Sequence, residues 1–147
     1  LFTQYVNDSS YSIAGAALMG IANSDPARAM TLAKKMAPDA KGKLDEAIAA
    51  LIMQHGTEAD FDFLQKRYVD MPLSQAKMSA SMAFCNYLSK LSDLEKVKSG
   101  IDKVIAFRND IPEAYRNFTD PAIKAALDIV SNAKGAEIET YIKNALK

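Results

Sequence analysis

Residues 8–36 read DSSYSIAGAALMGIANSDPARAMTLAKKM, and this stretch predicts two helices joined by a tight turn. Small and apolar residues recur at the three- and four-residue spacing of one helical face on both sides of the turn. They are Ala14, Ala17, Leu18 and Ile21 before it and Ala29, Leu32, Ala33 and Met36 after it. Asp25 can cap the second helix, and Pro26 at its first position costs no hydrogen bond. One such hairpin cannot bury both of its faces, so we expect neighbouring hairpins.

The same spacing continues along the chain and predicts about eight helices. They span approximately residues 9–22, 26–37, 42–55, 57–71, 74–91, 92–107, 121–134 and 138–145. The first is apolar nearly all round, with Ile13, Ala16 and Met19 on its second face, so we expect an inner helix. The fifth has two apolar stripes and is expected to be the most buried. One of these stripes holds Met78, Met82 and Cys85.

Short polar signals mark several of the predicted boundaries. Pro38 ends the second helix, and Gly56 stands where a left-handed cap would end the third. Capping boxes are predicted at the starts of the fourth and sixth helices. Their residues are Thr57 with Asp60, and Ser92 with Glu95.

Residues 108–121, RNDIPEAYRNFTDP, form the longest stretch that is predicted to be irregular. It holds Tyr115, Arg116 and Phe118, and loop residues on a rigid scaffold often bind ligands. Alternatively, these aromatic side chains close the end of the helical array. The stretch ends with Asp120 and Pro121, which repeat the start signal seen at Asp25 and Pro26.

Helix pairs begin near residues 9, 42 and 74, a period of about 33 that is typical of helical-hairpin arrays. The tetratricopeptide pattern aligns with only one unit. The prediction is therefore an all-α fold, an irregular α-α superhelix of the HEAT-like kind, forming a single helical-repeat domain over residues 1–147.

Composition excludes several classes of protein. The chain has 147 residues, with 18 basic and 18 acidic side chains that cancel to a net charge of zero. A nucleic-acid binder usually carries a basic stripe, and the sequence has none. No apolar run is long enough to span a membrane, and the first ten residues do not resemble a signal peptide. We expect a soluble domain of unknown compartment, and since the chain begins with leucine, a C-terminal fragment of a longer protein.

The sequence offers few candidates for catalysis. A zinc peptidase motif, H-E-x-x-H, needs two histidines, and the chain has only His55. At a helix C-terminus, His55 is better explained by a partly buried structural role than by a functional one. Cys85 is the only cysteine, so no internal disulfide is possible, and it is expected to be a buried apolar residue rather than a nucleophile.

Other polar and adaptable residues also favour structural roles. Asp60 and Asp62 lie two apart on a helix, point to different sides, and are expected to cap it rather than to act as an acid–base pair. The seven methionines could form an adaptable binding groove, but core filling is the better explanation. We therefore assign no catalytic, cofactor-binding or metal-binding residue.

The opening unit resembles the C-terminal helical domain of bacterial aminopeptidase N-type zinc metallopeptidases, of the gluzincin family. Members carry a D-x-S-Y-x-[VI]-x-x-A-A-L helix, a turn like L-D-P and an A-x-x-L-A helix. The corresponding residues are Asp8, Ser10, Tyr11, Ile13, Ala16, Ala17 and Leu18, then Asp25 and Pro26, then Ala29, Leu32 and Ala33. The match covers about thirty residues, and the rest of the chain agrees in helical character and length.

This resemblance implies a parent enzyme that removes N-terminal residues from peptides with a zinc ion. Its H-E-x-x-H site would lie in an upstream catalytic domain, and the helical domain would pack on that domain and restrict access of the peptide substrate. No cofactor is expected in this chain, and zinc is expected only in the parent. The expected partners are that catalytic domain and the peptide, with no nucleic acid and no membrane.

Two further hypotheses stay open at this stage. A free-standing HEAT-like module that binds protein partners would show the same helical pattern without any peptidase. A small helical enzyme with an acid–base pair is a third hypothesis, although no acidic, histidine and nucleophilic residues converge in the sequence.

Overall fold

The described part of the chain is built from helices alone. The computed structural model describes residue 4 and residues 10–147, and these residues include no strand. Contacts group the chain into two units, Leu1–Gly56 and Thr57–Lys147, and each unit is described by itself. The prediction of an all-α fold is confirmed, whereas a continuous superhelix and a single repeat domain stay predictions.

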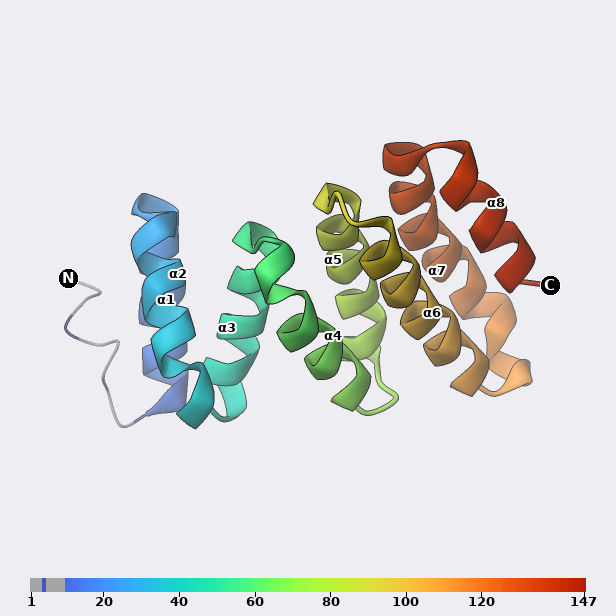
Figure 1. The fold of residues 1–147 in the computed structure, drawn as a ribbon. Helices are drawn as coiled ribbons and strands as arrows, with labels where there is room; N and C mark the ends of the chain where they lie inside the picture. The colour runs from blue at the N-terminus through green and yellow to red at the C-terminus, as the bar shows by residue number, and fades with distance from the viewer. Residues whose placement is uncertain (1–3, 5–9) are drawn as a thin grey trace. The chain divides into compact units, whose positions relative to one another are not determined.

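The first unit consists of three α-helices and one short 3-10 turn. They are α1 (Tyr11–Ser24), α2 (Pro26–Met36), η2 (Ala37–Asp39) and α3 (Gly42–His55). Helix α3 packs against both α1 and α2 (Figure 1). A Cβ atom on Gly15 would lie 3.0 Å from the carbonyl oxygen of Lys43, so glycine at this position permits the close approach of α1 and α3.

The turn between α1 and α2 has the chemistry that the sequence predicts. The Asp25 carboxylate accepts a hydrogen bond of 3.0 Å from the backbone N–H of Arg28, and Pro26 occupies the first position of α2. Ala29 and Ala33 are buried on the inner face of α2. This capped hairpin confirms the local prediction for residues 8–36 within the part that the structure describes.

The prediction that α1 is buried all round is wrong. Its first face is buried as expected, but Ile13 on the second face is 46% exposed, and Ala16 is exposed as well. Helices α2 and α3 together cover only the first face of α1. The second face is therefore not needed for the packing of this unit.

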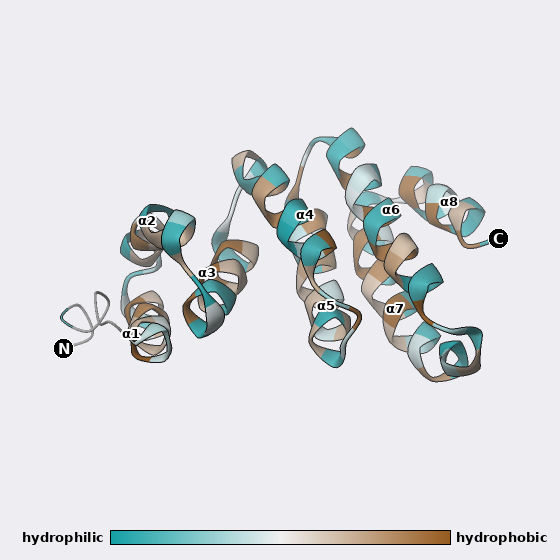
Figure 2. Ribbon diagram, turned by 90° about the horizontal axis from the view of Figure 1, so that it is seen from below, coloured by the Kyte–Doolittle hydropathy of each residue, from teal (hydrophilic) through white to brown (hydrophobic). Residues whose placement is uncertain are grey.

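The second unit arranges five α-helices in two layers. They are α4 (Phe61–Asp70), α5 (Gln75–Lys90), α6 (Leu94–Asp110), α7 (Glu113–Lys134) and α8 (Ala136–Ala145), after the 3-10 turn η3 (Glu58–Asp60). Helices α4, α6 and α8 form one layer, and α5 and α7 lie side by side in the other (Figure 2). Each helix therefore contacts both the next helix and the next but one.

An aromatic cluster holds α4, α5 and α6 together in this unit. The Tyr68 ring stacks on Phe84 with 4.9 Å between centroids and meets the edge of Phe107 at 6.3 Å. The Tyr68 hydroxyl lies 2.6 Å from the Ser81 hydroxyl, so its polar end is satisfied inside the core. Offset and edge-on pairs of this kind stabilise a core beyond their burial alone.

Two of the predicted boundary signals differ in the structure, and a third is confirmed. Gly56 has φ −69°, so it is not a left-handed cap. Helix α6 is capped by Asp93 rather than by Ser92, because the Asp93 carboxylate accepts hydrogen bonds from the N–H groups of Glu95 and Lys96. The Thr57–Asp60 capping box is confirmed, and it belongs to η3 at the start of α4.

The prediction of an irregular stretch at residues 108–121 is also wrong. Helix α6 continues to Asp110, and α7 begins at Glu113 and passes through Pro121 without ending. The predicted start at Asp120 and Pro121 therefore lies inside a helix. Helix α7 ends at Gly135, as predicted, where φ is +86° and favours glycine.

The methionine stripe predicted on α5 is not buried. Met82 is exposed and Met78 is half-buried, whereas Lys77 and Ser81 occupy buried positions on α5. Among all seven methionines only Met53 is buried. The core is filled by branched and aromatic side chains instead, so the prediction that methionines fill it is wrong.

Candidate functional site

The residue types of a conventional active site do not gather in the described part of the chain. Among residue 4 and residues 10–147, no three His, Cys, Asp or Glu side chains lie close enough together to hold a metal ion. His55 is exposed at the end of α3, so the expectation of a partly buried imidazole is wrong. Cys85 is buried, as predicted, and burial raises the pKa of its thiol to about 12. A thiol with such a pKa is a poor nucleophile at neutral pH.

Asp60 and Asp62 have the separate structural environments that the sequence predicts. Asp60 is buried, and its carboxylate accepts a hydrogen bond of 2.9 Å from the backbone N–H of Thr57. Asp62 is exposed in the first turn of α4. Because Asp60 is committed to capping the start of its helix, the two carboxylates do not form an acid–base pair.

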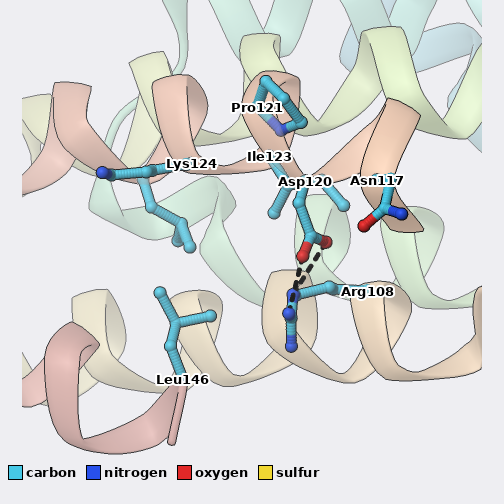
Figure 3. A pocket seen from close by; sticks show the side chains of 8 residues that line it. Arg108, Asn117, Asp120, Pro121, Ile123, Lys124 and Leu146 are labelled. Carbon is cyan, nitrogen blue, oxygen red and sulfur yellow. Dashed lines mark hydrogen bonds and ion pairs between the residues drawn. The ribbon is translucent and has the colours of Figure 1, made fainter. Parts of the chain in front are cut away.

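A hollow of about 420 Å³ lies among α6, α7 and the end of α8 (Figure 3). Apolar side chains form part of its wall, and charged and amide groups lie among them. The lining residues are Arg108, Asn117, Asp120, Pro121, Ile123, Lys124, Leu127 and Leu146. The hollow is therefore a candidate binding site in the second unit.

An ion pair joins α6 to α7 on one side of this hollow. The Arg108 guanidinium donates two hydrogen bonds to the Asp120 carboxylate, of 2.9 Å from Nε and 2.7 Å from Nη2. Hydrogen bonding to Asp120 raises the pKa of Arg108, so the guanidinium stays charged. The bidentate geometry fixes both side chains, although partial exposure limits what the pair adds to stability.

Pro121 removes one backbone hydrogen bond from α7 beside the same hollow. Proline has no N–H, so the carbonyl of Asn117, four residues earlier on α7, lacks its helical donor. Both Asn117 and Pro121 line the hollow. A carbonyl without its helical donor beside a charged pair could accept a hydrogen bond from a bound group.

A second hollow of about 310 Å³ continues along α7 and α8. It shares Lys124, Leu127 and Leu146 with the first hollow, and its rim includes Glu139 and Lys143. The two hollows together present an apolar floor with charges of both signs. Such a surface can hold an apolar side chain with a polar end, but the groups that line it provide no activated nucleophile.

The residues that the sequence singled out between α6 and α7 have different roles. Arg116 donates hydrogen bonds to the carbonyl oxygens of Asn109 and Ile111, at 2.9 and 3.0 Å, and so caps the end of α6. Tyr115 and Phe118 are exposed on α7 and do not line the hollow. The sequence does not reveal the pair of Arg108 and Asp120, because Asp120 followed by proline has the pattern of a helix start.

Neither the helices in the described part of the chain nor the comparisons with known proteins point to a membrane span or to a known family. No helix in the described residues is long and apolar enough to cross a membrane. The chain matches no protein-family model, no curated protein and no solved structure.

Proposed function

We propose that this chain is a non-catalytic helical domain of a zinc aminopeptidase, where it packs on the catalytic domain and restricts access of peptides. The proposal rests on the resemblance of residues 8–36 to that family. Part of this resemblance is explained by hairpin packing alone, because Ala17, Ala29 and Ala33 are buried in the first unit. Tyr11 and Ile13 are 43% and 46% exposed, however, and packing within the unit does not require them.

These exposed shared residues are the observation that carries the proposal. A generic helical hairpin would need the buried small residues but would place polar residues on its solvent side. In the proposed arrangement, Tyr11 and Ile13 are the positions of the motif that a partner domain covers. The catalytic domain of the parent is the partner that the resemblance suggests.

The first test is to sequence the gene upstream of Leu1. An H-E-x-x-H motif followed by a further glutamate is expected, in a domain that precedes this chain. An unrelated upstream domain, or a start codon directly before Leu1, would contradict the proposal.

The isolated chain is expected to hydrolyse no aminoacyl substrate, with or without added zinc, because the described residues include no cluster of His, Cys, Asp or Glu that could hold a metal ion. Release of a chromophore from an aminoacyl anilide measures this directly. Turnover by protein free of contaminating peptidase would exclude a non-catalytic role.

The full-length enzyme then provides a test of the packing role. Ile13→Asp should leave the melting temperature of the isolated chain nearly unchanged, because Ile13 is exposed there. In the full-length enzyme it should weaken discrimination between short and long peptides. Ala27→Asp, at an exposed position of α2 outside the shared motif, is the matched control.

The alternative is a free-standing module that binds protein partners. It is favoured by Tyr115 and Phe118, which are 62% and 83% exposed on the second unit. The upstream sequence distinguishes the two functions, since a free-standing module has no catalytic domain ahead of it.

A further inference from the structure

An uncharged stripe runs along the outer side of α7. Exposed or half-buried residues follow one another at intervals of three and four, which places them on one helical face. They are Tyr115, Phe118, Ala122, Ala125, Ile129 and Ala133. Phe118 is 83% exposed and Tyr115 is 62% exposed, so the packing of the unit uses neither side chain fully. We call this set the α7 stripe.

The charged residues of α7 lie on a different side of the helix. Lys124 and Asp128 are exposed, but they line the hollow beside α8 rather than the α7 stripe. The neighbouring helix α5 is likewise uncharged at its exposed positions before its last residue. These positions are Gln75, Ala76, Ser79, Met82, Ala83 and Asn86.

The other layer of the unit has an ordinary charged surface. Helices α4, α6 and α8 expose acidic and basic side chains along their lengths. Examples are Asp62, Lys66, Glu95, Asp102, Lys103, Glu137 and Lys143. The two layers therefore differ in charge, and burying the α7 stripe with the exposed face of α5 before Lys90 removes fewer ions from water than burying the other layer. An exposed, uncharged, partly aromatic patch of this kind marks a protein interface.

The order of side chains along the α7 stripe indicates which protein covers it. Its large residues, Tyr115 and Phe118, lie in the first half of the helix, and alanines predominate in the second half. In an antiparallel pair of identical helices crossing near Ala122, Phe118 of one copy lies beside Ala125 of the other, and Tyr115 lies beside Ile129. The contact between Phe118 and Ala125 then occurs twice, once on each side of the axis, as a two-fold interface requires.

Charge and size fit the same arrangement. Near a two-fold axis each side chain lies close to the same side chain of the second copy. Because the stripe has no charged residue, no like charges meet there. Helix α7 has 22 residues and α5 has 16, so they are about 33 and 24 Å long and about 10 Å wide. Their flat footprint is roughly 570 Å², which is of the same order as the roughly 800 Å² per partner of stable complexes.

We propose that this chain forms a homodimer through the α7 stripe, with the two α7 helices antiparallel and Phe118 of each copy seated on the alanines of the other. Phe118 is the central aromatic anchor of the contact, and the exposed face of α5 forms its rim. The proposal does not depend on the proposed peptidase role.

Sedimentation velocity of the purified chain, from low to high micromolar concentration, tests the dimer. The expected species has twice the 16.0 kDa mass of the chain. Phe118→Asp should raise the dimer dissociation constant at least about thirty-fold, which is the effect of removing a central aromatic anchor. Ala106→Asp introduces the same charge at an exposed position of α6 and should leave the constant unchanged. Far-UV circular dichroism checks that both variants are folded.

Cysteine cross-linking tests the antiparallel orientation. A short bis-maleimide should join two copies of Ala122→Cys, which lies near the axis, and should not join two copies of Ala133→Cys. The native Cys85 is buried and does not compete. A cross-link at both positions would indicate a parallel pair and overturn the arrangement.

Two other outcomes would overturn the dimer itself. A chain that stays monomeric at every concentration would show that the stripe does not bind a second copy. A dimer that survives Phe118→Asp would show that the two copies associate through a different face.

Discussion

Lys77 is the residue whose position is least expected from the sequence. Its side chain is buried, and the ammonium donates hydrogen bonds to the carbonyl oxygens of Val69 and Met71, at 3.1 and 2.9 Å. It also lies over the rings of Tyr68 and Phe107, 5.3 and 5.4 Å from their centroids. Burial lowers its pKa. Lys77 therefore supplies a donor to two further carbonyls at the end of α4, beside the cap bond from the Met71 N–H to the Arg67 carbonyl.

Replacing Lys77 with methionine should destabilise the chain by about 1–3 kcal/mol, because the two carbonyls lose their donor while the apolar stem is kept. Urea unfolding, followed by circular dichroism, measures the change. Lys103→Met, at an exposed position of α6, is the control and should change the free energy of unfolding by less than about 0.5 kcal/mol. Equal effects of the two substitutions would mean that Lys77 does not cap α4.

Leu51→Ala tests the core of the first unit. Leu51 is fully buried on α3, so truncation should cost about 2–5 kcal/mol from lost transfer energy and the cavity that remains. Denaturant unfolding measures the loss, and Ile13→Ala, on the exposed face of α1, should cost much less. A loss well below 1 kcal/mol for Leu51→Ala would contradict its central position.

Residue-level signals were reliable where one local interaction decides the geometry. The cap of Asp25 on α2 and the Thr57–Asp60 box depend on contacts within three residues, and both occur as predicted. At the start of α6 the cap moved by one residue. The Glu58 carboxylate accepts hydrogen bonds from the N–H groups of Ser92 and Asp93 there, over a separation that local patterns cannot reveal.

At the scale of elements, α7 shows how strong local signals can mislead. Proline usually ends a helix, yet Pro121 lies inside α7. Because the lost hydrogen bond is at the surface and Asp120 pairs with Arg108, the helix continues at a tolerable cost. Helix α3 contains no proline that contradicts its apolar spacing, and its bounds, Gly42–His55, match the prediction.

Pro121→Ala should stabilise the chain by about 1–2 kcal/mol. Alanine restores the hydrogen bond to the Asn117 carbonyl and has the higher helix propensity, and these gains exceed the entropy that proline removes from the unfolded chain. Thermal and urea unfolding measure the gain. Pro112→Ala, at the position before α7 begins, is the matched control and should not stabilise. A loss of stability in Pro121→Ala would show that the shape of the hollow requires the proline.

At the scale of the whole molecule, buried tyrosine and cysteine side chains make the free energy of unfolding depend on pH in the alkaline range. Burial raises the pKa of Cys85 and of Tyr87 to about 12 each, and it also raises the pKa of Tyr68. In the unfolded chain these groups lose their protons from about pH 9–10. The native state thus binds more protons than the unfolded state in this range.

Stability should accordingly be fully present below about pH 9 and fall as the pH rises toward 12. Lys77 acts in the opposite sense near its ordinary pKa of 10.5, because its folded-state pKa is lowered, and it offsets part of the fall. Urea unfolding at pH 7.5, 9 and 10.5 measures the trend. Tyr68→Phe removes one titrating group and should give a shallower decline; a stability independent of pH up to 10.5 would contradict the burial of these groups.

Long-range relations limited what could be predicted for the whole chain. The all-α class followed from apolar spacing, since helix packing needs a stripe on each helix. The hollow beside Arg108 and the α7 stripe depend on which faces neighbours leave uncovered. The side-chain types along α7 do not reveal which face is uncovered, because alanine and isoleucine occur both in a buried core and on an exposed face.

The tyrosines of the molecule are divided unevenly between its two units. Tyr68 and Tyr87 are buried in the second unit, whereas Tyr11, the described tyrosine of the first unit, is exposed. The chain has no tryptophan, so near-ultraviolet circular dichroism reports mainly on the rigid interior of the second unit. Far-ultraviolet dichroism follows the helices of both. Melting curves that coincide at the two wavelengths would show that the units unfold as one cooperative system, and curves that separate would give each unit its own transition.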